Sequence, residues 1–179
     1  MDDFRTLIDS ETIASRISEL ARDVSDRYAD VQPCTVAVIE GARVFSKALM
    51  RHLSWPVEVH EVRAGSYGDG MESSGSVAVT GGDSIDVNGR RLLLIEDIVD
   101  TGRTVARLRE YFLGRGAVDV SVITLLSKPS RRVIEVELEF VGFEIPNEFV
   151  IGFGMDVAGN YRDLDRIAIY EETRALGGG

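Results

Sequence analysis

An acidic pair follows a buried strand directly in one short stretch of this sequence. The apolar run 92–95 predicts the strand, and Glu96 and Asp97 stand at its carboxyl end. Ligands of open α/β sheets bind at the carboxyl ends of strands, so the two carboxylates are placed to contact one. Beside an anionic ligand such acids must face hydroxyls or a metal ion, because they would otherwise repel it.

Hydroxyl groups and a glycine come next, in a predicted loop over residues 96–102 that leads into a helix. Backbone N–H groups at a helix N-terminus, the hydroxyls of Thr101 and Thr104 and a close approach at Gly102 can together hold a phosphate. With the acidic pair, this fits a sugar phosphate whose diol faces the carboxylates. The same residues could instead only cap the helix, with Asp100 and Thr101 as caps, and the pattern by itself does not decide.

The elements around this stretch alternate between strands and helices. Apolar residues recur at helical spacing over 10–29, from 44 until Pro56 stops the second helix, and from about 103 to 113. Short apolar runs predict strands, and they lie at 34–39, 57–63, 77–79, 91–95, 118–126, 140–143, 149–152 and 167–170. This order indicates an α/β fold, a mostly parallel sheet flanked by helices, in a single domain over residues 1–179. Residues 65–76 hold four glycines and four serines and predict a mobile loop.

Composition excludes several classes of protein. The chain has 179 residues, of which 44% are apolar and 28% charged, and a net charge of −10. No apolar run approaches the roughly 18 residues that span a bilayer, and so acidic a surface disfavours nucleic acid and anionic lipid as partners. One cysteine and two histidines exclude a disulfide framework and a zinc finger. With an acidic N-terminus unlike a signal peptide, we expect a cytoplasmic location.

Residues 96–104, Glu-Asp-Ile-Val-Asp-Thr-Gly-Arg-Thr, resemble the phosphoribosyl-pyrophosphate (PRPP) signature of the type I phosphoribosyltransferases. Other stretches, in the same order, resemble the hypoxanthine-guanine branch of that family. They are Ser-Tyr-Gly-Asp-Gly at 66–70, Glu-Ser-Ser-Gly at 72–75, residues 125–132 and 140–150, Gly-Met-Asp at 154–156 and Tyr-Arg-Asp-Leu at 161–164. The matches cover roughly residues 35 to 170, and they favour this family over simple helix caps.

The resemblance implies a purine salvage enzyme with a small hood over the sheet. It would transfer the 5-phosphoribosyl group from PRPP to N9 of hypoxanthine or guanine, giving IMP or GMP and pyrophosphate, with Mg²⁺ and as a homodimer or homotetramer. Asp100 would be the general base that takes the proton from N7. The residues implied to bind PRPP are Gly41, Glu96, Asp97, Asp100, Thr101, Gly102, Arg103, Thr104 and Arg162.

The same resemblance assigns the purine and metal sites. Phe149 would stack on the purine and the Val150 backbone would bond its edge, and the purine site as a whole would comprise Ile98, Phe149, Val150 and Asp156. The metal would lie against Glu96, Asp97 and Asp156. A flexible loop with Ser66 and Tyr67 would close over the site and exclude water.

Two positions depart from the family pattern and suggest an alternative. A lysine usually stands three residues before Phe-Val-Gly-Phe and reaches the 6-oxo group, and that position is Glu137 here; a lysine also commonly stands where this chain has Glu40. A carboxylate only accepts hydrogen bonds, so Glu137 predicts a base preference shifted toward adenine or xanthine, or a regulatory role. RNA-binding regulation would need a basic face, which this acidic chain disfavours.

Overall fold

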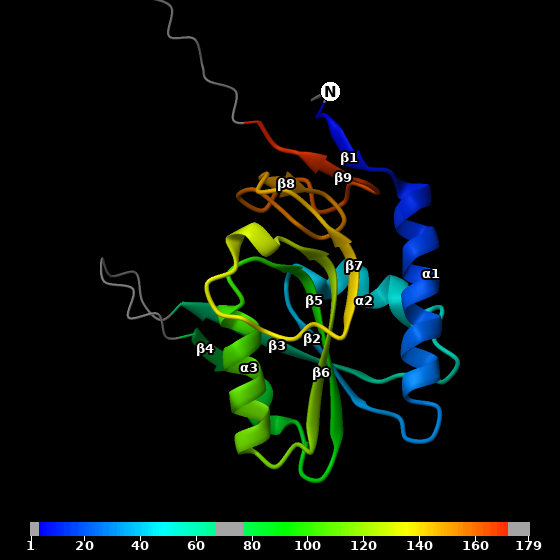
Figure 1. Cartoon of the computed structure of the whole chain (residues 1–179), viewed down its shortest axis with the longest axis vertical. Coiled ribbons are helices and arrows are strands. Elements are labelled where there is room, and N and C mark those ends of the chain that lie inside the picture. The colour runs from blue at the N-terminus through cyan, green and yellow to red at the C-terminus, as the bar shows by residue number, and fades with distance from the viewer. Residues whose placement is uncertain (1–3, 67–76, 172–179) are drawn as a thin grey trace, which may run out of the picture.

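The computed structural model describes residues 4–66 and 77–171, and its main feature is a six-stranded sheet (Figure 1). The strands are β2 (Cys34–Val38), β3 (Val59–Ser66), β4 (Val77–Thr80), β5 (Arg91–Val99), β6 (Asp119–Ser127) and β7 (Phe140–Glu144). They lie in the order β4-β3-β2-β5-β6-β7, and every neighbouring pair is parallel except β3 and β4. The predicted mostly parallel sheet is confirmed.

Helices cover both faces of this sheet. They are α1 (Ser10–Arg27), α2 (Ala42–Met50) and α3 (Arg103–Gly114), with short 3₁₀ turns at η1 (Gly82–Ser84) and η2 (Pro129–Arg131). Buried side chains of β5 alternate between the two faces, as the period of a strand requires. Leu93 and Ile95 share one core with α1 and α2, whereas Leu92 and Leu94 share the other with α3. A β5 buried on both faces explains its unbroken apolar sequence.

A second, three-stranded sheet joins the two ends of the described chain. It consists of β1 (Thr6–Ile8), β8 (Val150–Ile151) and β9 (Ile167–Ile169), in the antiparallel order β1-β9-β8. Figure 1 shows it above the end of the main sheet where β5 leads into the turn before α3. This small sheet is the predicted hood. The strand β1 was not predicted, because three residues are too short to show a periodic pattern.

Some predicted boundaries are wrong. The sequence predicts a loop over residues 96–102, whereas β5 continues to Val99 because its pairing with β6 continues, with Glu96 opposite Thr124 and Ile98 opposite Leu126. The second helix ends at Met50, before Pro56. Of the predicted mobile loop, residues 65 and 66 belong to β3, and residues 67–76 lie outside the described residues. In the described ranges, no helix has the length and hydropathy needed to cross a membrane.

Candidate active site

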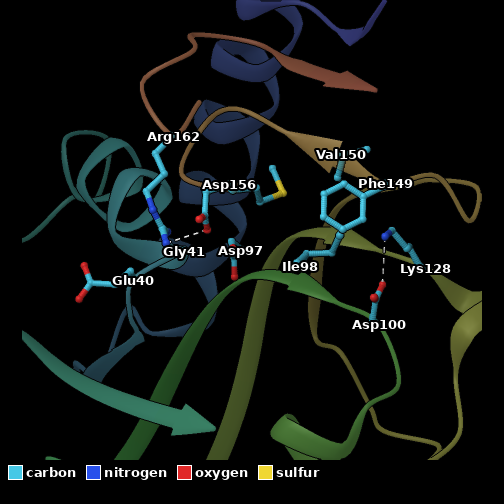
Figure 2. Close-up of a pocket in the computed structure, with 11 residues that line it drawn as sticks. Glu40, Gly41, Asp97, Ile98, Asp100, Lys128, Phe149, Val150, Asp156 and Arg162 are labelled. Carbon is cyan, nitrogen blue, oxygen red and sulfur yellow. Dashed lines mark ion pairs between the residues drawn. The ribbon is translucent and has the colours of Figure 1, made fainter. Parts of the chain in front are cut away.

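A cavity of about 370 Å³ opens at the carboxyl ends of β2, β5 and β6, under the segment that contains β8 (Figure 2). Four separate parts of the sequence meet there, as parallel strands that end at one edge of a sheet allow. The residues that line it are Glu40, Gly41, Asp97, Ile98, Asp100, Lys128, Phe149, Val150, Met155, Asp156 and Arg162. Carboxylates and one guanidinium lie at one end, and an aromatic ring and an ammonium at the other.

Eight of the predicted site residues line this cavity: Gly41, Asp97, Ile98, Asp100, Phe149, Val150, Asp156 and Arg162. Five others do not line it: Glu96 is buried, Thr101 and Gly102 lie in the turn before α3, and Arg103 and Thr104 are the first residues of that helix. Ser66 ends β3, and Tyr67 lies outside the described residues. The cavity thus brings together the predicted purine contacts and part of the predicted PRPP contacts.

The acidic end of the cavity combines Asp97 with an ion pair. Asp156 Oδ1 lies 2.7 Å from Arg162 Nη2, and Asp156 Oδ2 accepts the Gly159 N–H at 2.6 Å. A Cβ on Gly41 would overlap the Asp97 carboxylate, so only glycine lets the chain after β2 approach this closely. The two carboxylates and the guanidinium are therefore held in fixed positions around one end of the cavity.

Two carboxyl groups are adjacent on β5: Glu96, which is buried, and Asp97, which lines the cavity. Burial raises the pKa of Glu96 well above its ordinary value, and the nearby Asp97 charge and hydrogen bond raise it further. Burial also raises the pKa of Asp97, although backbone hydrogen bonds, the bond from Glu96 and the Arg162 charge oppose that rise. A protonated Glu96 that donates to an ionised Asp97 accounts for the further rise in the pKa of Glu96 and for the opposing effect on the pKa of Asp97.

The raised pKa of Glu96 makes stability depend on pH with a definite sign. Above the ordinary glutamate pKa the unfolded chain loses a proton that folded Glu96 keeps, so the free energy of unfolding falls as pH rises. Glu96→Gln removes this loss, and we expect its melting temperature to gain on the wild type between about pH 5 and about pH 8 in EDTA. Glu110→Gln, on exposed α3 surface, is the matched control. A gap between Glu96→Gln and wild type that does not change with pH would contradict the assignment.

The donor set suits a metal ion that arrives with a ligand. Among the described residues no three His, Cys, Asp or Glu side chains form a ready metal site. Asp97 and Asp156 nevertheless both line the acidic end of the cavity. Mg²⁺ is commonly bound by one or two carboxylates together with substrate phosphates, and this pair fits such a role.

The turn before α3 is braced from behind by the chain that follows η2. Thr101 O accepts the backbone N–H groups of Val133 and Ile134, each at 3.0 Å, and Arg132 Nη1 donates to Asp100 O at 2.8 Å. Gly102 has a φ of 81°, in the left-handed region, and a Cβ there would overlap the Ile134 carbonyl. These contacts fix the N-terminus of α3 beside the cavity, as a phosphate-binding turn requires.

The other end of the cavity is built for a flat, polar ring. Phe149 is 55% exposed, and among the described residues its one ring contact is with Tyr170, with centroids 5.8 Å apart and planes at 62°. Below it, Lys128 is buried and its Nζ lies 3.4 Å from Asp100 Oδ1 (Figure 2). That oxygen is buried and accepts no hydrogen bond from a described residue. An ammonium donor and a carboxylate thus lie together beside an exposed aromatic face.

A family model for the phosphoribosyl transferase domain matches residues 5–158. The chain belongs to the phosphoribosyltransferase family. It is 38% identical over 165 residues to the hypoxanthine-guanine phosphoribosyltransferase of Bacillus subtilis, with 92% of each chain covered. A crystal structure of such an enzyme from Bacillus anthracis, with HEPES in its active site, has a TM-score of 0.88 and 33% identity, covering 94% of this chain and all of that one. The hypoxanthine phosphoribosyl transferase of Trypanosoma cruzi, studied for its oligomeric state, has a TM-score of 0.86 and 31% identity, covering 96% and 94%.

The structure does not bring Glu137 to the cavity, contrary to the expectation from the family pattern. Glu137 is exposed and does not line the phosphoribosyltransferase cavity, whereas Lys128 does. The reason is the place of each residue in the fold: Lys128 directly follows β6 at the cavity edge, its N–H donating to Val99 O at 3.0 Å, and Glu137 lies in the irregular segment before β7. The premise for a shifted base preference is therefore absent from this site.

The sequence prediction also missed Arg132, which positions the turn. Its guanidinium donates to Ser127 Oγ at 2.9 Å and to the Val99 and Asp100 carbonyls at 3.2 and 2.8 Å. No local pattern distinguishes it from neighbouring Arg131. The signal for Lys128 was stronger, since a lysine at the carboxyl end of an apolar strand, just before a proline, stands where ligands bind.

Proposed function

We propose that the chain transfers the 5-phosphoribosyl group of PRPP to N9 of hypoxanthine or guanine and releases pyrophosphate. One observation carries this proposal: a single cavity has an anion-and-metal end at Asp97, Asp156 and Arg162 and a base end at Phe149 and Lys128. The names of the relatives supply the substrate class. Lys128 is a donor, so it favours the 6-oxo group of these bases over the 6-amino group of adenine.

The reaction needs a base near the purine imidazole ring, and Asp100 supplies one. N9 forms a bond to the anomeric carbon, the bond from that carbon to the pyrophosphate oxygen breaks, and pyrophosphate leaves with the electron pair. The N7 proton of the purine passes to the Asp100 carboxylate. Lys128, 3.4 Å from Asp100 Oδ1, holds that carboxylate in place and donates to O6.

The sugar carries positive charge in the transition state, and the acidic end of the cavity suits it. The ionised Asp97 carboxylate faces the ribose and stabilises an oxocarbenium-like centre. Asp97 and Asp156 would hold a Mg²⁺ ion together with the substrate, and that ion would neutralise charge on the leaving pyrophosphate. Arg162, paired with Asp156 at 2.7 Å, contacts the same group. The N-terminal turn of α3 at 101–104 takes the 5′-phosphate.

A comparison of four bases tests the proposal. We expect kcat/KM for hypoxanthine and guanine, with PRPP and Mg²⁺, to exceed that for adenine by at least about 100-fold, because a buried donor left facing an amine loses its hydrogen bond. Xanthine completes the set as a second 6-oxopurine. Preference for adenine, or no turnover with any of the four, would contradict the proposal. We also propose that the chain forms a homodimer or homotetramer, and sedimentation would measure this oligomeric state.

A further inference from the structure

The rim of the cavity near Gly41 carries an ion-pair cluster of two glutamates and two arginines. Glu40 Oε2 lies 2.9 Å from Arg43 Nη1, and Glu40 Oε1 lies 2.5 Å from Arg63 Nη2. Arg43 also contacts Glu61 twice, with Nε 3.1 Å from Oε1 and Nη2 3.0 Å from Oε2. Within this cluster, Glu40 is the member that lines the cavity.

The sheet brings this cluster to the anion end of the site. Strands β2 and β3 are parallel with Val38 opposite Val62, so Glu40, two residues beyond Val38, and Arg63, the next residue of β3, lie near the same end of the two strands. The Ile39 N–H donates to Val62 O at 2.8 Å and keeps the two chains together past the strand. Figure 2 shows Glu40 on the side of the cavity away from the base end, with its carboxylate turned outward.

A lone carboxylate at this rim would oppose the proposed substrate. PRPP is highly anionic, and Asp97 and Asp156 already place negative charge at this end of the cavity. The two guanidiniums that pair with Glu40 offset the repulsion between its carboxylate and an anionic substrate, and they bring N–H donors to this rim. Arg43 is bound by two carboxylates, but Arg63, whose side chain is 60% exposed, makes its one ion pair among the described residues with Glu40. A guanidinium has five N–H donors, so Arg63 has donors left for a ligand.

We infer that Glu40 is a positioning residue that holds the Arg63 guanidinium at the cavity rim, where Arg63 binds the pyrophosphate group of PRPP. The inference rests on the proposed function and names which residues of this chain supply the cation at that end.

The direction in which Glu40→Gln changes KM for PRPP distinguishes this role from simple repulsion of the substrate. If Glu40 positions Arg63, both Glu40→Gln and Arg63→Gln raise KM for PRPP about tenfold, with kcat and KM for hypoxanthine changed less than about threefold. A Glu40 that only repels the substrate would give the opposite result, a lower KM for PRPP in Glu40→Gln, and that result would overturn the inference. Unchanged KM in Arg63→Gln would overturn it as well.

Matched variants and a binding measurement complete the test. Glu110 and Arg107 form an exposed ion pair on α3, and Glu110→Gln and Arg107→Gln should leave KM for PRPP unchanged. The double variant Glu40→Lys/Arg63→Gln restores an ammonium at the rim and should return KM to within about threefold of wild type. Calorimetry with Mg²⁺ and inorganic pyrophosphate should show about tenfold weaker binding to Arg63→Gln. Equal affinity of wild type and Arg63→Gln for pyrophosphate would overturn the inference. Turnover of hypoxanthine by the wild type, measured alongside, tests the proposed function separately.

Discussion

Asp100→Asn is expected to lower kcat for hypoxanthine about 10²- to 10⁴-fold, the contribution of a positioned general base. The asparagine amide keeps the size of the side chain and can still accept a hydrogen bond, but it cannot take the N7 proton. Steady-state assays with PRPP and Mg²⁺ measure the loss. Calorimetry should find the Kd for PRPP changed less than about threefold, since the 5′-phosphate turn at 101–104 uses backbone groups.

Asp26→Asn provides the control for this experiment. Asp26 is exposed near the end of α1, far from the cavity residues in the sequence and absent from the lining. Its substitution removes the same charge and should leave kcat unchanged. If Asp100→Asn turned over hypoxanthine as fast as wild type, another group would be the base, and the role of the Lys128–Asp100 pair would need a different explanation.

Lys128→Gln is expected to change which purine the chain accepts. The buried ammonium is the one cation at the base end of the cavity lining, and a hydrogen bond from a charged group contributes about 1.5–3 kcal/mol. The kcat/KM for hypoxanthine and guanine should therefore fall by about 10- to 100-fold. Adenine, which offers no 6-oxo acceptor, should change less than about threefold, so the ratio between the bases is the measurement.

The chain offers a natural control, because Lys47 is its only other lysine. Lys47 lies exposed on α2, and Lys47→Gln should leave both kcat/KM values unchanged. Thermal unfolding of both variants checks that loss of the Lys128–Asp100 pair has not unfolded the protein. An unaltered preference for hypoxanthine in Lys128→Gln would show that the 6-oxo group is recognised elsewhere.

Much of the fold followed from patterns that depend on nearby residues. The apolar strand 92–95 and the helices that bury Ile17 and Phe112 have periodic faces, and those faces are what the two cores bury. The end of β5 did not follow, because Glu96 and Asp97 interrupt the apolar pattern. Pairing with β6 extends the strand to Val99, and that contact comes from residues about 30 positions further along the chain.

Site residues within one contiguous motif could be predicted from the sequence. A residue located only by its distance from a motif, across an irregular segment, could not. The segment 96–104 placed Asp97, Ile98 and Asp100 at the cavity, and these residues line it. The position of the family's base-contacting lysine was assigned to Glu137 by counting back from Phe140. No helix or strand in that segment fixes where a side chain points. Burial distinguishes the two candidates, since Lys128 is buried at the cavity and Glu137 is exposed, and burial is a property of the folded chain.

The most direct test is a crystal structure of the chain with Mg²⁺, PRPP and a hypoxanthine analogue that cannot react at position 9. We expect the 5′-phosphate on the main-chain N–H groups of 101–104 and the pyrophosphate between Asp156 and Arg162. We also expect the 6-oxo oxygen to lie within about 3.2 Å of Lys128 Nζ. A phosphate-free turn, or a purine bound at the Arg162 end of the cavity, would contradict these expectations.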